Sequence, residues 1–210
     1  MINDYRNSKY CPDLGNVQER KGKIADLIKR DHPYASDMHT YLSKNDDIYK
    51  KKFLEAYNYK CAYCGISSTL IPKNSFEIDH FIYKMSPKFS SKKKAGTMEN
   101  LVLSCHECNH KKNAFLVSDE AYSKLHPDKA YMGKTFCRDG LFYIKVSEKE
   151  INNQEIVKFY EQLQLGSEVH RLDYLLLSMI GLQKIHKNNV KFYAEMGKIV
   201  DMLRQKRNVL

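Results

Sequence analysis

The fold of this chain is decided by residues 101–112, which read LVLSCHECNHKK. The stretch begins as a short apolar run, continues into a Cys-x-x-Cys pair (Cys105 and Cys108), and ends in polar and basic residues. A second Cys-x-x-Cys pair, Cys61 and Cys64, lies upstream. Four thiols at this spacing are typical ligands of one tetrahedral zinc ion, and disulfides are the alternative use of them. We predict a structural zinc site with no open coordination position.

The composition limits the classes of protein to which the chain can belong. It has 210 residues, of which 42% are hydrophobic and 29% charged, and its formal net charge is +10. This is enough apolar material for one domain of ordinary size. The excess of basic residues is typical of proteins that bind a polyanion such as nucleic acid. A basic solvated surface without any partner would give the same charge.

Targeting and membrane segments are not expected. Residues 1–10 are polar, and the longest apolar stretch, residues 172–182, is too short to cross a bilayer. The chain has six cysteines without a visible secretion signal, which favours a reducing, cytoplasmic compartment. We expect Cys11 and Cys137, which lie outside the two pairs, to be free thiols.

The pattern of apolar residues predicts an α+β fold, mainly helical, in three parts. Residues 1–54 are expected to form a helical lead-in, residues 55–117 a dense core, and residues 118–210 a strand followed by helices that complete the core or bind a partner. Further helices are predicted at residues 17–29 and in the segment that contains Phe53 and Leu54, with Ser43 and Asp46 as its start signal; from Glu107 through Phe115; and at residues 153–163, 167–186 and 190–205. Strands are predicted at residues 75–81, 101–104 and 140–146, and Ser147 with Glu150 fits a capping box.

Polar residues suited to catalysis lie between and after the two cysteine pairs. Asp79 and His80 end a predicted strand, Asn100 precedes the next one, and Asn109 directly follows Cys108. A neutral imidazole can act as a general base, and carboxylate or amide oxygens suit magnesium or manganese. Each residue taken alone also fits an ordinary loop hydrogen bond or turn. Their combination in one segment predicts a reactive site beside the zinc.

Lysines lie next to these residues and could contact phosphates. We predict nucleic-acid contacts for Lys84, Lys88, Lys92, Lys93, Lys94, Lys111 and Lys112. A solvated basic face is the alternative explanation.

The order of these motifs strongly resembles the zinc-containing branch of the HNH endonuclease family over about residues 55–115. The motifs are CAYCG at 61–65, DH at 79–80 and NLVLSCHECNHKK at 100–112. The resemblance implies a ββα-metal core and metal-dependent hydrolysis of DNA. It implies that His80 activates water, that Asp79 and Asn109 bind the catalytic cation, and that Asn100 orients the loop that carries His80. His110 is the substitute cation ligand.

The flanking segments more loosely resemble the PtuB-like nuclease subunits of Septu-type anti-phage systems. The similarity is carried by YCPDL at residues 10–14, LHP at residues 125–127 and the amphipathic C-terminal helices. It implies a bacterial defence function with an ATPase (PtuA-like) partner, which would bind the C-terminal helices. A homodimer or a monomeric core are the alternatives for these helices.

Three other functions stay open. The chain could be a stand-alone restriction or homing-type HNH nuclease, an RNase effector, or a zinc-stabilised nucleic-acid-binding module without catalysis. The last alternative needs the four thiols and the basic charge, but it does not need Asp79, His80, Asn100 and Asn109 together. Their joint presence favours an enzyme.

Overall fold

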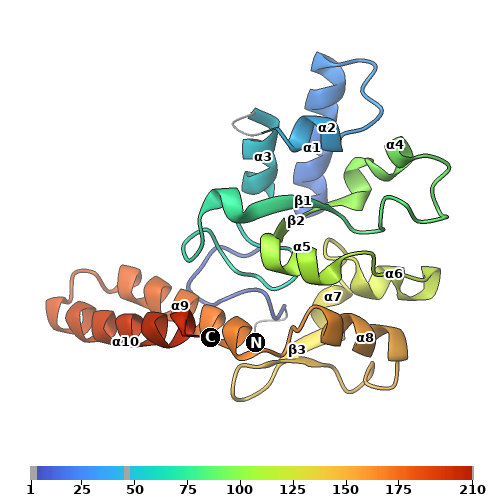
Figure 1. Cartoon of the computed structure of the whole chain (residues 1–210). Helices are drawn as coiled ribbons and strands as arrows, with labels where there is room; N and C mark the ends of the chain where they lie inside the picture. Colours follow the sequence, from blue (N-terminus) through green and yellow to red (C-terminus); the bar gives the residue numbers. More distant parts are fainter. Residues whose placement is uncertain (1–3, 45–47, 210) are drawn as a thin grey trace.

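The computed structural model describes residues 4–44 and 48–209 of the chain, and its first part is helical (Figure 1). Helix α1 (Val17–Asp31) confirms the first predicted helix, and the side chain of Asn16 caps it by accepting a hydrogen bond from the Glu19 N–H. The short helix α2 (His39–Leu42) was not predicted, and α3 (Ile48–Ala56) follows it. Of the predicted start signal of α3, Asp46 lies outside the described residues, and Ser43 instead ends α2.

The central part is a pair of strands followed by a helix. Strand β1 (Phe76–His80) pairs antiparallel with β2 (Leu101–Cys105), and α5 (His106–Lys112) begins where β2 ends. The connection between the strands is not a plain loop, because it contains α4 (Lys92–Ala95) and the 3₁₀ turn η2 (Met98–Asn100). A further 3₁₀ turn, η1 (Lys73–Ser75), precedes β1.

Helix α5 is shorter than predicted. It ends at Lys112, because Asn113 adopts a positive φ of 46°, which an α-helix does not allow. The predicted continuation to Phe115 is therefore wrong.

The remaining part has a small hairpin and five helices in the described residues. The elements are α6 (Asp119–Leu125), α7 (Met132–Thr135), β3 (Phe136–Arg138), β4 (Ile144–Val146), α8 (Gln154–Gln162), α9 (Glu168–Ile185) and α10 (Val190–Asn208). The predicted capping box is wrong: the backbone from Ser147 to Glu150 forms a turn. The cap of α8 is Asn153, whose side chain accepts hydrogen bonds from two backbone N–H groups of the first turn.

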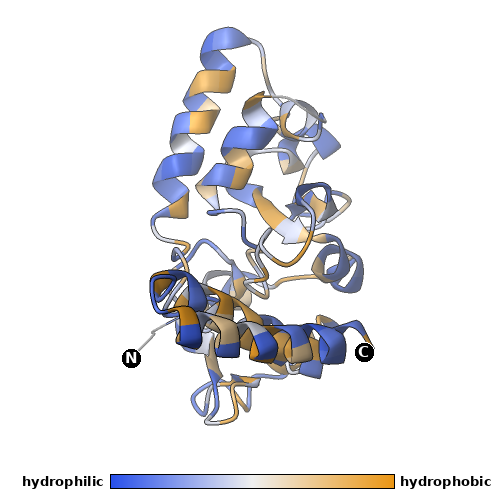
Figure 2. Cartoon of the chain, turned by 90° about the vertical axis from the view of Figure 1, so that its left-hand side faces the viewer, coloured by the Kyte–Doolittle hydropathy of each residue, from blue (hydrophilic) through white to orange (hydrophobic). Residues whose placement is uncertain are grey.

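One hydrophobic core joins most of the chain. Its buried residues run from Tyr5 in the first segment to Leu165 after α8, and they include both paired strands. Helices α9 and α10 pack on each other around Leu176, Ile180 and Val200, and Figure 1 shows this hairpin projecting from the body. Figure 2 shows hydrophobic and hydrophilic residues alternating along the helices, as expected for helices that bury one side. The chain is thus rich in helix with two small two-stranded sheets, in line with the expected fold class.

No helix in the described part of the chain is both long and apolar enough to cross a membrane.

Candidate active site

The four paired cysteines come together at the junction of β2 and α5. Their Sγ atoms all lie within 4.8 Å of one another, and all four residues are buried. The Sγ atoms of Cys64 and Cys105 are 3.9 Å apart. A tetrahedral zinc with Zn–S bonds of about 2.3 Å places its sulfurs about 3.8 Å apart. The thiols therefore fit one zinc ion and are too far apart for the disulfide alternative.

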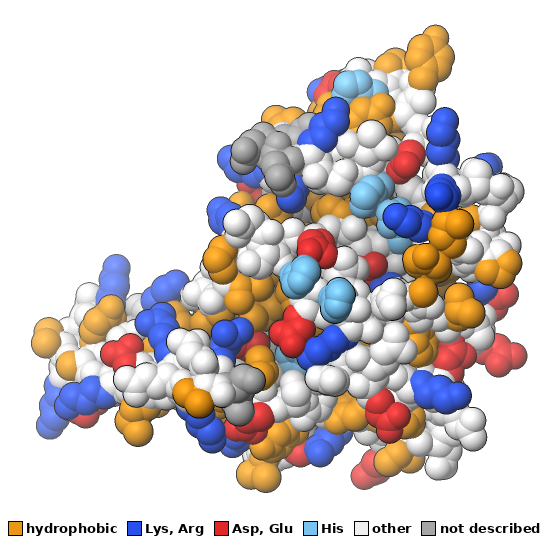
Figure 3. Space-filling model, in the orientation of Figure 1, with side chains coloured by type: hydrophobic (Ala, Val, Ile, Leu, Met, Phe, Trp, Pro, Cys, Tyr) orange, Lys and Arg blue, Asp and Glu red, His pale blue; other side chains and the backbone are white. Residues whose placement is uncertain are grey.

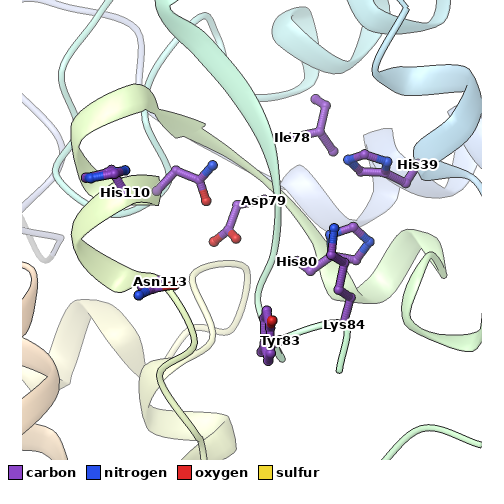
Figure 4. Close-up of a pocket in the computed structure, with 9 residues that line it drawn as sticks. His39, Ile78, Asp79, His80, Tyr83, Lys84, His110 and Asn113 are labelled. Atoms are coloured by element: carbon purple, nitrogen blue, oxygen red, sulfur yellow. The ribbon is translucent and has the colours of Figure 1, made fainter. Parts of the chain in front are cut away.

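Three of the four residues of the predicted reactive site, Asp79, His80 and Asn109, line one cavity next to β1 and α5, and Asn100 does not. The cavity has a volume of about 430 Å³, and among the residues that line it are His39, Asp79, His80, Lys84, Asn109 and His110. Side chains alternate along a strand, so neighbours point to opposite faces. Figure 4 shows this for β1: Asp79 points toward α5, whereas Ile78 and His80 lie on the other side with His39. The space-filling view shows one face of the molecule, in the orientation of Figure 1. His side chains gather in the middle of this face, beside acidic and basic side chains (Figure 3).

Asp79 is buried and makes two polar contacts through one carboxylate oxygen. Tyr63 donates its hydroxyl to Oδ2 at 2.6 Å, and the Lys112 ammonium lies 3.2 Å from the same atom. Burial raises the pKa of Asp79 to about 6, although both contacts oppose this rise. At neutral pH the side chain is therefore mostly a carboxylate, and its Oδ1 is the oxygen left for a cation.

His80 is half-buried at the end of β1. Burial, and after it the neighbouring His39, lower the pKa of its imidazole to about 4. The ring is therefore neutral at physiological pH, which is the state that can accept a proton. Its backbone is also fixed, because the buried ammonium of Lys112 donates to the carbonyl of His80 at 3.0 Å and to that of Phe81 at 3.3 Å.

Asn100 lies under the turn that follows His80. Its Oδ1 accepts the N–H of Ile82 at 2.8 Å, and its Nδ2 donates to the carbonyls of Ile82 at 3.0 Å and Ala95 at 2.8 Å. All polar atoms of this buried amide are thus used by backbone groups of the connection between β1 and β2. This is the kind of contact that an orienting role for Asn100 requires.

Asn109 and His110 both lie in α5, and both line the cavity. The Nδ2 of Asn109 donates to Oε2 of Glu77, so the amide oxygen is the atom left for a cation. The other carboxylate oxygen of Glu77 lies 2.6 Å from Nδ1 of His106, which is exposed. Carboxylate and amide oxygens are the ligands that magnesium and manganese prefer, so Asp79 and Asn109 fit the predicted cation chemically.

The predicted phosphate-binding lysines differ in their exposure and in their partners. Lys84 is exposed and lines the cavity, and the three lysines of α4 (Lys92, Lys93 and Lys94) are also exposed. Lys88 binds the carbonyl of Val117 and the carboxylate of Asp119, and Lys111 pairs with Glu107 at 2.8 Å. Lys112 is 1% exposed and is bound inside the site, so its predicted contact with phosphate does not fit the structure.

Three residues of the site were not predicted. Glu77 could have been found, because it lies two positions before Asp79 and therefore on the same face of β1. Tyr63 stands between two cysteines, and its sequence position gives no sign that its hydroxyl reaches Asp79. His39 lies in a four-residue helix far upstream, and no local pattern connects it with His80.

Residues 61–115 match the family model described as HNH endonuclease. The matched segment begins at Cys61, the first residue of the four-cysteine cluster, and includes β1, β2 and α5. The match supports an HNH-type nuclease domain in this segment. No curated protein and no solved structure matches the chain.

Proposed function

We propose that the chain is a metal-dependent HNH-type endonuclease that hydrolyses phosphodiester bonds of DNA. The observation that carries the proposal is one cavity lined by His80, Asp79 and Asn109, three residues of the segment that matches the HNH model. These three side chains offer a neutral base and two oxygen ligands for a divalent cation, which is the set that metal-assisted hydrolysis needs.

The reaction follows from the state of each side chain. His80 takes a proton from water through its neutral imidazole, and the water oxygen attacks the phosphorus. The bond from phosphorus to the 3′ oxygen then breaks, the leaving 3′ alkoxide takes a proton from a solvent water, and the products are a 3′ hydroxyl and a 5′ phosphate. Asp79 and Asn109 would hold magnesium or manganese, which stabilises the negative charge that develops on the phosphate. Asn100 and Lys112 keep the backbone around His80 in place.

The zinc has a different task in this proposal. Cys61, Cys64, Cys105 and Cys108 would hold the zinc ion, and the ion would tie Cys61 and Cys64 to the end of β2 and the start of α5. Asn109 follows Cys108 directly in α5. The position of the four-cysteine cluster therefore fixes the backbone from which the Asn109 side chain extends into the cavity. The zinc is structural, and the second cation is catalytic.

DNA is the substrate that we propose, and RNA is the alternative. Lys84 at the cavity and Lys92, Lys93 and Lys94 on α4 are the exposed cations that could bind phosphates. Such contacts are independent of base sequence, so we expect the chain alone to show little sequence preference.

The biological setting that we propose is anti-phage defence in the cytoplasm, with an ATPase partner. It rests on the resemblance of the flanking segments to PtuB-like subunits. The α9–α10 hairpin is the candidate docking element, since it exposes Ile185, Tyr193 and Met202. Co-purification of the chain with the product of the adjacent gene tests this setting, and a lone chain that is fully active and binds no partner would contradict it.

A cleavage assay with His80→Ala tests the activity itself. The substrates are a supercoiled plasmid, single-stranded DNA and RNA, each with magnesium or manganese. We expect the wild-type chain to cut DNA and the variant to lose about 10²–10⁴-fold in rate, which is the usual contribution of a general base. Zinc content and the unfolding midpoint should stay unchanged. The matched control is His186→Ala at the exposed end of α9, which should retain full activity.

The result also separates the alternatives. Cleavage of RNA with no cleavage of DNA would show that the substrate is RNA and not DNA. Binding of DNA without any cleavage by the wild-type chain would favour the non-catalytic module.

A further inference from the structure

The imidazole of His39 packs against the imidazole of His80 in a tilted arrangement. Their ring centroids are 4.5 Å apart, the ring planes make an angle of 32°, and both residues line the same cavity. Figure 4 shows the two rings side by side on one side of β1. His39 belongs to α2 and lies outside residues 61–115, so the segment that matches the HNH model does not contain it.

The segment around His39 is held in place from two directions. The ring of His39 packs against His80 at the end of β1. On the other side, the N–H of Met38 donates to the carbonyl of Gly96 at 2.8 Å. Gly96 stands four residues before Asn100, so α2 is fixed both to β1 and to the connection that returns to β2.

Asp37 and Gly96 make this contact tight. The Oδ1 of Asp37 accepts the N–H of His39 at 3.0 Å. A Cβ placed on Gly96 would lie 1.9 Å from that same oxygen, so any larger residue at this position would displace Asp37. The position of His39 is therefore coupled to a glycine in the connection between the paired strands.

We propose that His39 is a positioning residue of the nuclease site, whose ring packs against His80 and keeps that imidazole in the orientation needed to take a proton from water. The inference rests on the proposed function, because it assigns His39 a role through the base. Ring pairs at such distances favour defined relative orientations. A base that loses its orientation by about 1 Å can lose about 10²-fold in rate.

The contact between the two rings is one of packing, with their centroids 4.5 Å apart. If His39 acts through ring packing, an aromatic residue whose ring does not ionise, such as Phe, can replace it without loss of activity. A role in proton transfer would require the imidazole itself.

The first test compares His39→Ala with His39→Phe in the full chain, using cleavage of a short DNA duplex with manganese. We expect kcat of His39→Ala to fall about 10–100-fold with KM within about twofold, and kcat of His39→Phe to stay within about threefold of the wild type. The control is His32→Ala, since His32 also stacks on a ring, that of Tyr41 at 4.6 Å, but does not contact His80. Unchanged kcat in His39→Ala would overturn the inference, as would equal loss in His39→Ala and His39→Phe.

The second test does not depend on cleavage. The ring-proton resonances of His80, assigned by NMR, should carry a ring-current shift in the wild type and in His39→Phe, and should lose it in His39→Ala. Gly96→Ala, which displaces Asp37, should move them in the same direction. Unchanged His80 resonances in His39→Ala would overturn this inference alone, whereas a wild-type chain that cuts no nucleic acid would overturn the proposed function.

Discussion

The ammonium of Lys112 lies 3.2 Å from the carboxylate of Asp79, and both side chains are buried. The same ammonium donates to the backbone carbonyls of His80 and Phe81. One lysine of α5 therefore binds the end of β1 at three points, and it neutralises a carboxylate that burial makes unfavourable. Lys112 therefore stabilises the site. It is the most deeply buried of the seven lysines that were predicted to contact phosphates.

Replacement of Lys112 should strongly reduce stability. Lys112→Met leaves Asp79 buried without its cation and leaves two carbonyls without a donor, so we expect a loss of about 3 kcal/mol in the free energy of unfolding. Urea unfolding measures this loss. Lys111→Met is the matched control, because the pair of Lys111 with Glu107 is partly exposed and such a pair contributes less than about 1 kcal/mol. Equal stabilities of the two variants would contradict the structural role of Lys112.

Removal of the proposed structural zinc should unfold the site as a whole. The Cys108→Ser variant should contain one zinc fewer per chain than the wild type, and a strong chelator should remove one zinc per chain from the wild type. Both should lower the unfolding midpoint, because the cluster joins the segment of Cys61 and Cys64 to the segment of Cys105 and Cys108. Metal analysis and thermal unfolding measure the two effects. Cys137→Ser is the control, since Cys137 is exposed and lies outside the cluster. A chelated chain with an unchanged midpoint would show that the thiols do not hold a structural metal.

The pH dependence of stability should contain a contribution from His126. This buried ring receives a hydrogen bond from the Asp128 N–H at Nδ1, and its Nε2 lies 3.1 Å from the Glu99 carbonyl, which fits the neutral form. Burial lowers the pKa of His126 to about 4 from its usual 6.5. A lowered pKa means that the contribution is complete above pH 6.5 and is lost as the pH falls through about 4.

The size of this contribution follows from the shift. A pKa change of this size corresponds to on the order of 3 kcal/mol. The difference in unfolding free energy between the wild type and His126→Asn should therefore narrow by about that amount between pH 7.5 and pH 4. A difference that stays constant over this range would show that His126 titrates normally.

The lysines of α4 should contribute to the salt dependence of DNA binding. Lys92, Lys93 and Lys94 are exposed beside the connection that leads to Asn100, so their joint replacement by Ala should weaken binding and flatten the plot of log affinity against log salt. Fluorescence anisotropy with a labelled duplex measures both effects. The control is the joint replacement of Lys184, Lys187 and Lys191 by Ala, which removes the same number of positive charges from the α9–α10 hairpin. Identical slopes for the two triple variants would exclude a local role for α4.

The amino-acid sequence by itself determined the local parts of this protein. The spacing of the four cysteines predicted a single cluster, and alternation and apolar content predicted β1 and β2 within one or two residues. These signals are legible because ligand spacing and strand periodicity depend on neighbours along the chain. The same holds for the order of Asp79, His80, Asn100 and Asn109, on which the resemblance to HNH nucleases depends.

Only the tertiary structure decided which distant residues complete the site. The sequence marks Lys112 as one more surface lysine, and it gives no reason to connect His39 with His80 or Tyr63 with Asp79. The physical reason is that burial and pairing depend on how α2, α5 and the zinc cluster pack around β1. No period along the chain encodes that packing, so the roles of these three residues become visible only when the chain is folded.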